Sequence, residues 1–202
     1  MELIYFPVKG RAEVIRLMLI DNGTSYTETS CANDWDSKWK PKMAFGQTPC
    51  LKDGDLTLVQ SNSIIRHLAR KFSLYGANEA EACRADIIND SVEDLRSAYV
   101  NLIYNNYDAG KEEYINKLPA KLQYFEKYIE GKSPYVLGDH ICFADYSLFE
   151  LLDIHLVLAP SCLDKFPALK ALHTTVGSRQ KVKAHRDSDA VKAMPINGNG
   201  KQ

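Results

Sequence analysis

The stretch that determines the fold is Gly46-Gln-Thr-Pro-Cys-Leu-Lys-Asp-Gly-Asp-Leu-Thr-Leu-Val-Gln-Ser-Asn-Ser-Ile-Ile-Arg66. Within it, Asp53-Gly54 is a strong signal for a tight turn, and the run 56–59 after it has the length of a short strand. Apolar residues then recur at helical spacing from Ile64 onwards, so we expect a β-hairpin that leads directly into a helix. The N-terminus of a helix presents backbone N–H groups and a partial positive charge, which bind a carboxylate or a phosphate well.

Two residues of this stretch carry further expectations. Ser61 is a good N-cap for the helix, and capping alone is a sufficient structural explanation for it. Pro49 opens the hairpin, where its missing N–H falls outside the hydrogen-bonded ladder. A cis bond between Thr48 and Pro49 would turn the backbone of Thr48 outward towards a ligand, but the sequence leaves the state of that bond open.

Upstream of the hairpin, the sequence predicts alternating strands and helices. Residues 3–6 fit a buried strand, and residues 12–20 fit a helix that Asn22-Gly23 closes. The weak alternation over 26–29 predicts an edge strand, and 34–43 predicts an irregular helix. The resulting order β-α-β-α-β-β-α indicates a small mixed sheet, which is an α/β, thioredoxin-like architecture.

The remainder of the chain is predicted to be an all-α domain. Residues 73–80 form a linker between a first domain over 1–72 and a helical domain over 81–202. Helices are expected over 81–106, 111–129, 143–158, 167–176 and 178–187, with a break at Gly110. On composition alone, the tail from Pro195 is predicted to be disordered.

Composition excludes several classes of function. The chain has 202 residues and a formal net charge of −1, so nothing indicates a nucleic-acid or membrane partner. No apolar run approaches the roughly 18 residues of a membrane-spanning helix. The five cysteines and five histidines lack the spacing of a metal site, and we expect reduced thiols, a cytoplasmic location and no bound metal.

The segment Phe45-Gly-Gln-Thr-Pro and the run from Asp53 to Leu68 resemble the glutathione-binding core of cytosolic glutathione transferases, most closely the pi class. Tyr5-Phe-Pro-Val-Lys-Gly-Arg, Phe143-Ala-Asp-Tyr and Pro195-Ile-Asn-Gly-Asn-Gly-Lys-Gln extend the resemblance over nearly the whole chain. It implies a homodimeric glutathione S-transferase that conjugates the glutathione thiolate to hydrophobic electrophiles in detoxification. Glutathione would be the co-substrate, with no permanently bound cofactor.

Such an enzyme must stabilise a thiolate. A free thiol with a pKa near 8.5 is only roughly a few per cent ionised at neutral pH, and the thiolate is the nucleophile. Tyr5, at the end of the first predicted strand, could donate its hydroxyl to the sulfur, although packing at a strand end explains a tyrosine equally well. An arginine at position 11, in the first turn of a helix, opposes the helix dipole. The resemblance makes Tyr5 and Arg11 the catalytic residues.

The resemblance also implies a set of glutathione-binding residues: Tyr5, Arg11, Trp35, Lys40, Gln47, Thr48, Gln60, Ser61 and Asp94. Gln60 and Ser61 would hold the γ-glutamyl end, and Thr48 would pair through its main chain like an added strand. Trp35 is preferred to Trp39 as the tryptophan contact, and that choice stays open.

A second set of residues is implied for the electrophile pocket: Phe6, Val8, Val100, Tyr104, Asn197 and Gly198. Val100 and Tyr104 lie on one face of the long predicted helix, where an apolar stripe is more commonly core. Asp94 would reach the partner subunit's glutathione, whereas a solvated helix charge is the alternative. Phe45 would be an aromatic knob inserted into the partner subunit, or a local packing residue.

Three positions depart from the pi-class pattern, and one of them is Gln180, where the class usually has a proline. Met43 stands where the class usually has a reactive cysteine. Cys142 replaces the hydroxyl residue that caps the helix before Phe143, and a lost cap costs about 1 kcal/mol. Asp145 can still serve the reciprocal half of that capping box.

Two alternatives remain open at this point. One is a sigma-like glutathione-dependent isomerase, such as a prostaglandin D synthase. The other is a non-catalytic relative, either a lens structural protein or a ligand-binding protein with a signalling-kinase partner. The presence of Tyr5, Arg11, Gln60 and Ser61 argues against a complete loss of catalysis.

Overall fold

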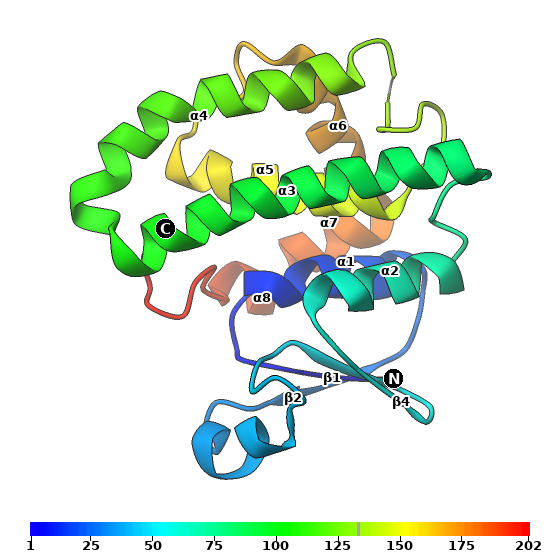
Figure 1. The fold of residues 1–202 in the computed structure, drawn as a ribbon, viewed down its shortest axis with the longest axis vertical. Helices are drawn as coiled ribbons and strands as arrows, with labels where there is room; N and C mark the ends of the chain where they lie inside the picture. Colours follow the sequence, from blue (N-terminus) through cyan, green and yellow to red (C-terminus); the bar gives the residue numbers. More distant parts are fainter. Residues whose placement is uncertain (133) are drawn as a thin grey trace. The chain divides into compact units, whose positions relative to one another are not determined.

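A computed structural model describes residues 1–132 and 134–202, and its contacts divide the chain into two compact units (Figure 1). The units are Met1–Phe72 with Gln180–Gly198, and Ser73–Arg179 with Asn199–Gln202. The sequence predicted a helical domain that runs from residue 81 to the end. The observed units differ from this prediction in their C-terminal part, because residues 180–198 belong to the first unit. Helix α7 (Gln180–Asp187) packs there against helix α1 (Glu13–Asp21).

The described residues of the first unit include a four-stranded mixed sheet with the order β2-β1-β3-β4. Its strands are β1 (Glu2–Tyr5), β2 (Thr27–Ser30), β3 (Cys50–Asp53) and β4 (Leu56–Val59). Strand β1 is parallel to β2 and antiparallel to β3, and β3 is antiparallel to β4. The mixed sheet, the edge position of β2 and the β3–β4 hairpin confirm the predicted thioredoxin-like order.

Helices α1 and α2 contact each other and lie on one side of this sheet (Figure 1). The remaining elements of the unit are α2 (Ser61–Lys71), α8 (Asp189–Ala193), the 3₁₀ turns η1 (Gly10–Ala12) and η3 (Lys40–Lys42), and the π-helical turn η2 (Trp35–Trp39). The turns η2 and η3 form the irregular helix that was predicted over 34–43. Helix α8 was not predicted. The core between helices and sheet includes Leu3, Ile15, Leu51 and Leu68, which are fully buried.

The second unit is helical throughout its main elements: α3 (Glu79–Asn105), α4 (Tyr107–Ile129), α5 (Phe143–Leu158) and α6 (Pro167–Gly177). Helix α5 contacts both α3 and α6, and most of its residues are buried. This confirms α5 as the centre of the helical core. Among the described residues, no helix is long and apolar enough to cross a membrane.

The predicted helix break at Gly110 was wrong. Gly110 lies inside α4, and the chain instead turns at Asn106, whose φ of −145° and ψ of 31° are not helical. A Cβ atom at Gly110 would lie 2.4 Å from Nδ2 of Asn106. The glycine therefore permits close packing at the α3–α4 corner. A glycine in the sequence does not by itself show whether it permits close packing or ends a helix.

The expected loss of the α5 cap is also corrected by the structure. Cys142 occupies the N-cap position, and both halves of the capping box are present. The backbone N–H groups of Cys142 and Val136 each donate to Asp145 at 2.8 Å. Burial raises the pKa of the Asp145 carboxyl to about 6 and raises the pKa of the Cys142 thiol well above its usual range. The buried Cys142 thiol therefore takes the place of the hydroxyl group in this capping box.

The prediction of a disordered tail was wrong. The N–H groups of Lys9 and Gly10 donate to the carbonyls of Pro195 and Ile196 at 2.9 and 3.0 Å, and Ile196 is buried. In the second unit, Nδ2 of Asn199 donates to the carbonyl of Ile103 at 2.8 Å. These partners are distant in sequence, so a polar composition could not reveal them.

Candidate active site

Tyr5 is held at the end of strand β1 by the turn that follows it. Its side chain is 9% exposed, and its hydroxyl oxygen accepts a hydrogen bond from the backbone N–H of Arg11 at 2.9 Å. Gly10 has a φ of +43°, and a Cβ atom there would lie 2.5 Å from the Tyr5 hydroxyl. Glycine is therefore required at position 10 by its backbone conformation and by the close approach of the tyrosine.

This geometry gives Tyr5 the properties of a hydrogen-bond donor to an anion. A phenol that accepts a hydrogen bond is polarised, so its own O–H becomes a stronger donor. The tail carbonyls of Pro195 and Ile196 hold the two residues before Arg11 in place. Arg16, which was not singled out from the sequence, also donates to this turn, at the carbonyls of Val8 and Lys9. The only sequence signal for Arg16 was a charged residue within an otherwise apolar stretch.

The start of helix α2 has a geometry that suits the binding of an anion. The helix begins at Ser61, and its first intrahelical hydrogen bond runs from the Ile64 N–H to the Gln60 carbonyl at 3.0 Å. The preceding N–H groups of the first turn point out of the helix end. Ser61 was expected as the N-cap, but Gln60 holds that position and makes no side-chain cap hydrogen bond. A carboxylate suits such a helix end.

Gln60 has an uncommon backbone conformation, with φ 68° and ψ 112°. Few non-glycine residues adopt a positive φ, and such residues cluster at ligand sites. Its Nε2 approaches Oε1 of Gln47 at 3.4 Å, which brings two predicted glutathione-binding residues together. The bond between Thr48 and Pro49 is cis, which answers the question that the sequence left open.

The two tryptophans lie in the turn η2 and are both half-buried. They pack with Phe6 against a small core of Ile4, Cys31, Met43 and Cys50. The ring centroids of Trp35 and Phe6 are 5.2 Å apart in an edge-on arrangement. Lys40 is exposed, and its Nζ lies 3.6 Å from Oδ1 of Asp36. Both tryptophans share this cluster, so the choice between them as a ligand contact stays open.

The protein's own thiols near Tyr5 are not competing nucleophiles. Met43, at the position where a reactive cysteine was expected from the pi class, is buried in the same small core. Burial raises the pKa of the Cys31 and Cys50 thiols, which keeps them protonated. The cysteines closest to Tyr5 along this sheet are therefore poor nucleophiles.

The other predicted site residues lie on the tail and in the second unit. Asn197 is buried in the first unit, and Gly198 follows it in an exposed position. Helix α3 carries Asp94, which is exposed, Val100, which is half-buried, and Tyr104, which is exposed. Their solvent exposure on a helix shows that the stripe from Val100 to Tyr104 is not simply core.

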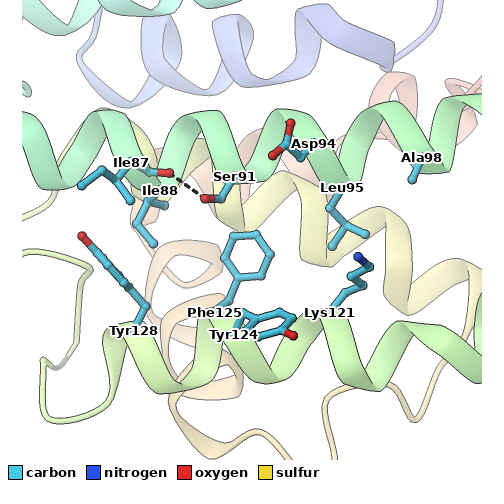
Figure 2. A pocket seen from close by; sticks show the side chains of 10 residues that line it. All are labelled: Ile87, Ile88, Ser91, Asp94, Leu95, Ala98, Lys121, Tyr124, Phe125 and Tyr128. Atoms are coloured by element: carbon cyan, nitrogen blue, oxygen red, sulfur yellow. Dashed lines mark hydrogen bonds between the residues drawn. The ribbon is translucent and has the colours of Figure 1, made fainter.

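A cavity of about 340 Å³ lies between α3 and α4, and the sequence did not indicate it (Figure 2). Its lining residues are Ile87, Ile88, Ser91, Asp94, Leu95, Ala98, Lys121, Tyr124, Phe125 and Tyr128. In Figure 2, side chains from α3 and α4 converge on a largely apolar and aromatic space, with Asp94 at its α3 side. The face of α3 that carries Ile87, Ser91, Leu95 and Ala98 thus lines a cavity instead of closed core.

Two family descriptions match this chain. "Glutathione S-transferase, N-terminal domain" matches residues 1–70, and "Glutathione S-transferase, C-terminal domain" matches residues 93–189. The chain is 50% identical to glutathione S-transferase P of Bos taurus and 47% identical to that of Homo sapiens, covering 99% of this chain and 98% of each relative. It matches the structure of the pi-class glutathione S-transferase of Onchocerca volvulus with a TM-score of 0.95 and 44% identity, covering 100% and 99% of the two chains.

Proposed function

The chain belongs to the pi class of the glutathione S-transferase family, and from that premise we propose how its own residues bind glutathione, ionise its thiol and meet an electrophile. It is a glutathione S-transferase, and glutathione is its co-substrate. The alternatives of an isomerase or a non-catalytic relative are not favoured, because the curated relatives are transferases over the full chain.

The observation that carries the mechanism is the hydrogen bond from the Arg11 N–H to the Tyr5 hydroxyl. In our proposal, the thiol proton of glutathione passes to solvent, Tyr5 donates its O–H to the resulting thiolate sulfur, and Arg11 supports the site through its amide. A drop of two units in thiol pKa requires about 2.7 kcal/mol of preferential binding of the anion. The thiolate then forms a carbon–sulfur bond to the electrophile, and the leaving group departs with its electron pair.

Glutathione would lie along the first unit with its γ-glutamyl carboxylate at the start of α2. Ser61, at that helix start, would donate its hydroxyl to the carboxylate, and Gln60 would help to hold the same γ-glutamyl end. Gln47, which lies beside Gln60, would bind the peptide portion. Thr48 would pair through its main chain. The glycyl carboxylate would meet Lys40 and one of the two tryptophans, Trp35 by preference.

The electrophile-binding residues stay a prediction from the family resemblance: Phe6, Val8, Val100, Tyr104, Asn197 and Gly198. Support comes from the exposed aromatic ring of Tyr104 and from the ordered position of Asn197. The substrates would be hydrophobic electrophiles, and the role detoxification. The five cysteines are all free thiols, which favours a reducing compartment such as the cytoplasm.

Replacement of Ser61 by Ala tests the proposed glutathione site. A hydrogen bond to a charged group is worth about 1.5–3 kcal/mol, so glutathione binding is expected to weaken by about 10- to 100-fold. Titration calorimetry of glutathione measures the change in Kd. The matched control is Ser63→Ala, because Ser63 is an exposed serine in the same first turn of α2. Equal affinity of the Ser61→Ala and Ser63→Ala variants would contradict the assigned site.

We also propose that the protein is a homodimer in which Phe45 of one subunit enters the cavity between α3 and α4 of its partner. Phe45 is a large apolar side chain that is 69% exposed, and the apolar rim residues Ile87 and Tyr124 are 51% and 72% exposed. An exposed apolar knob and an exposed apolar cavity on one chain favour association between copies. The position of Asp94 on the wall of the same cavity supports its assignment to the dimer face.

The Phe45→Ala variant is expected to be monomeric at concentrations where the unmodified protein is a dimer. Burial of one phenylalanine is worth about 1.5–3 kcal/mol, and a two-fold dimer buries two, so the dimer Kd should rise at least about a hundredfold. Sedimentation equilibrium measures this constant. Leu56→Ala is the control, because Leu56 is an equally apolar exposed residue of the first unit that the proposal leaves outside the interface. An unchanged dimer Kd in Phe45→Ala would remove Phe45 from its role, and a monomeric unmodified protein would remove both Phe45 and Asp94 from theirs.

A further inference from the structure

The turn between Tyr5 and Arg11 is fastened by a buried arginine. Arg16 on α1 is 1% exposed, and its Nη1 donates to the carbonyls of Val8 and Lys9 at 3.1 and 3.2 Å. These carbonyls belong to the Val8–Lys9 and Lys9–Gly10 peptide units, which directly precede the Gly10–Arg11 unit that carries the Arg11 N–H. Arg16 thus holds the backbone immediately before the Gly10–Arg11 unit, whose N–H is bonded to the Tyr5 hydroxyl.

Arg16 is itself held by two carboxylates. Its Nη1 lies 3.0 Å from Oε2 of Glu13, and its Nε lies 3.0 Å from both carboxylate oxygens of Glu28. A guanidinium buried to this extent is costly unless its hydrogen bonds and charge are matched. The fork geometry of arginine allows it to meet both carboxylates and the two carbonyls at once.

The far end of this network lies on the C-terminal segment. His185 on α7 places its Nε2 2.9 Å from Oε1 of Glu13, the carboxylate oxygen that does not bind Arg16. Glu13 is 4% exposed, so its second oxygen would be desolvated without this partner. The same segment contributes the tail carbonyls of Pro195 and Ile196 to the turn. Residues 180–198 therefore support the Tyr5 turn from two sides, all within the first unit.

We propose that Arg16, held in place by Glu13 and His185, is a positioning residue for the turn that presents the Arg11 amide to the Tyr5 hydroxyl. This inference rests on the proposed role of Tyr5 as donor to the thiolate. It extends the catalytic site to a histidine that touches neither glutathione nor the electrophile. The acidity of bound glutathione then depends on a side chain of α7.

The test replaces His185 by Phe and Glu13 by Gln, and follows the thiolate absorbance of bound glutathione as a function of pH. In each variant the pKa of the bound thiol is expected to rise by about half a unit to one unit, and kcat/KM at neutral pH to fall about three- to tenfold. The Kd for glutathione should stay within about twofold, because Ser61 and Gln60 lie outside the network. If His185 had a purely structural role, its replacement would not raise the pKa of the bound thiol while leaving the Kd for glutathione unchanged.

Two further variants sharpen the test. His185→Gln retains a hydrogen-bond donor towards Glu13 and is expected to recover most of the activity. His173→Phe is the matched control, because His173 is a half-buried histidine in the second unit that also bonds a carboxylate, that of Asp153 at 3.1 Å. It should lower stability without changing the pKa of the bound thiol.

A double variant tests whether the residues act in series. If they do, Glu13→Gln with His185→Phe should lose no more activity than the worse single variant. Multiplied losses, or a bound-thiol pKa in His185→Phe that equals the value in the unmodified protein, would overturn the proposal. A thiol pKa equal to that of free glutathione in the unmodified protein would instead reject the proposed role of Tyr5.

Discussion

Replacement of Tyr5 by Phe is expected to lower kcat/KM for conjugation of glutathione to an aryl halide by about 10²- to 10³-fold. The phenyl ring fills the same space beside Gly10 and Phe6, but the O–H donor to the thiolate is lost and the Arg11 amide loses its acceptor. The residues proposed for the γ-glutamyl end, Gln60 and Ser61, are unchanged. The Kd for glutathione should therefore stay within a few-fold, while the pKa of the bound thiol rises towards that of the free thiol.

Initial rates over a range of glutathione concentrations separate kcat from KM, and thiolate absorbance reports the ionisation directly. The control is Tyr75→Phe, since Tyr75 donates its hydroxyl to Asp86 at 2.9 Å in the second unit and has no proposed contact with glutathione. It should keep the rate within about twofold. Survival of activity within a few-fold in Tyr5→Phe, with glutathione still bound, would show that another group stabilises the thiolate.

The largest expected effect on stability comes from the buried ion pair between α3 and α5. Nη2 of Arg96 and Oε2 of Glu150 are in contact, and the two residues are 7% and 3% exposed. Glu150→Ala leaves a buried guanidinium without this carboxylate, and removal of one partner of such a pair costs about 3–5 kcal/mol. Denaturant unfolding at one fixed protein concentration measures the loss, because dimerisation would make stability depend on concentration.

Two variants show whether the loss comes from an uncompensated charge. The double variant Arg96→Met with Glu150→Leu replaces the pair by apolar groups of similar volume, so it should recover most of the lost stability. Glu113→Ala breaks the exposed pair with Lys117 and should leave the unfolding midpoint unchanged. A double variant as unstable as Glu150→Ala would show that the pair itself, and not the unmatched charge, provides the stability.

The sequence predicts the positions of some site residues better than those of others. Gln60 and Ser61 lie at a strand-to-helix junction that local spacing predicts. This junction places both residues beside a helix N-terminus, which favours the binding of an anion. Tyr5 could be placed at a strand end, but its bond to the Arg11 amide could not, because that bond depends on the positive φ of Gly10. Arg16 was missed because a single arginine within a helix has no periodic signature.

Other errors arose where one residue type serves two structural purposes. Gly110 was taken as a helix end, but it permits close packing of the α3–α4 corner inside a helix. Cys142 was taken as a lost cap, but its thiol accepts the N3 backbone hydrogen bond and Asp145 supplies the reciprocal half of the capping box. In both cases the competing explanation depended on neighbours that the local sequence does not identify.

The hairpin over residues 46–66, the order of strands and helices and the helical second half follow from local spacing, because turns and apolar periods act within about a dozen residues. The active site, by contrast, depends on contacts between residues that are far apart in the sequence. Tyr5, Arg11, Arg16, His185 and Ile196 come together through hydrogen bonds whose partners are separated by up to most of the chain. No local period records which distant carbonyl or carboxylate a buried donor will meet. Packing of α7 against α1, and of the tail against the turn after Tyr5, therefore sets the environment of the Tyr5 hydroxyl within the first unit.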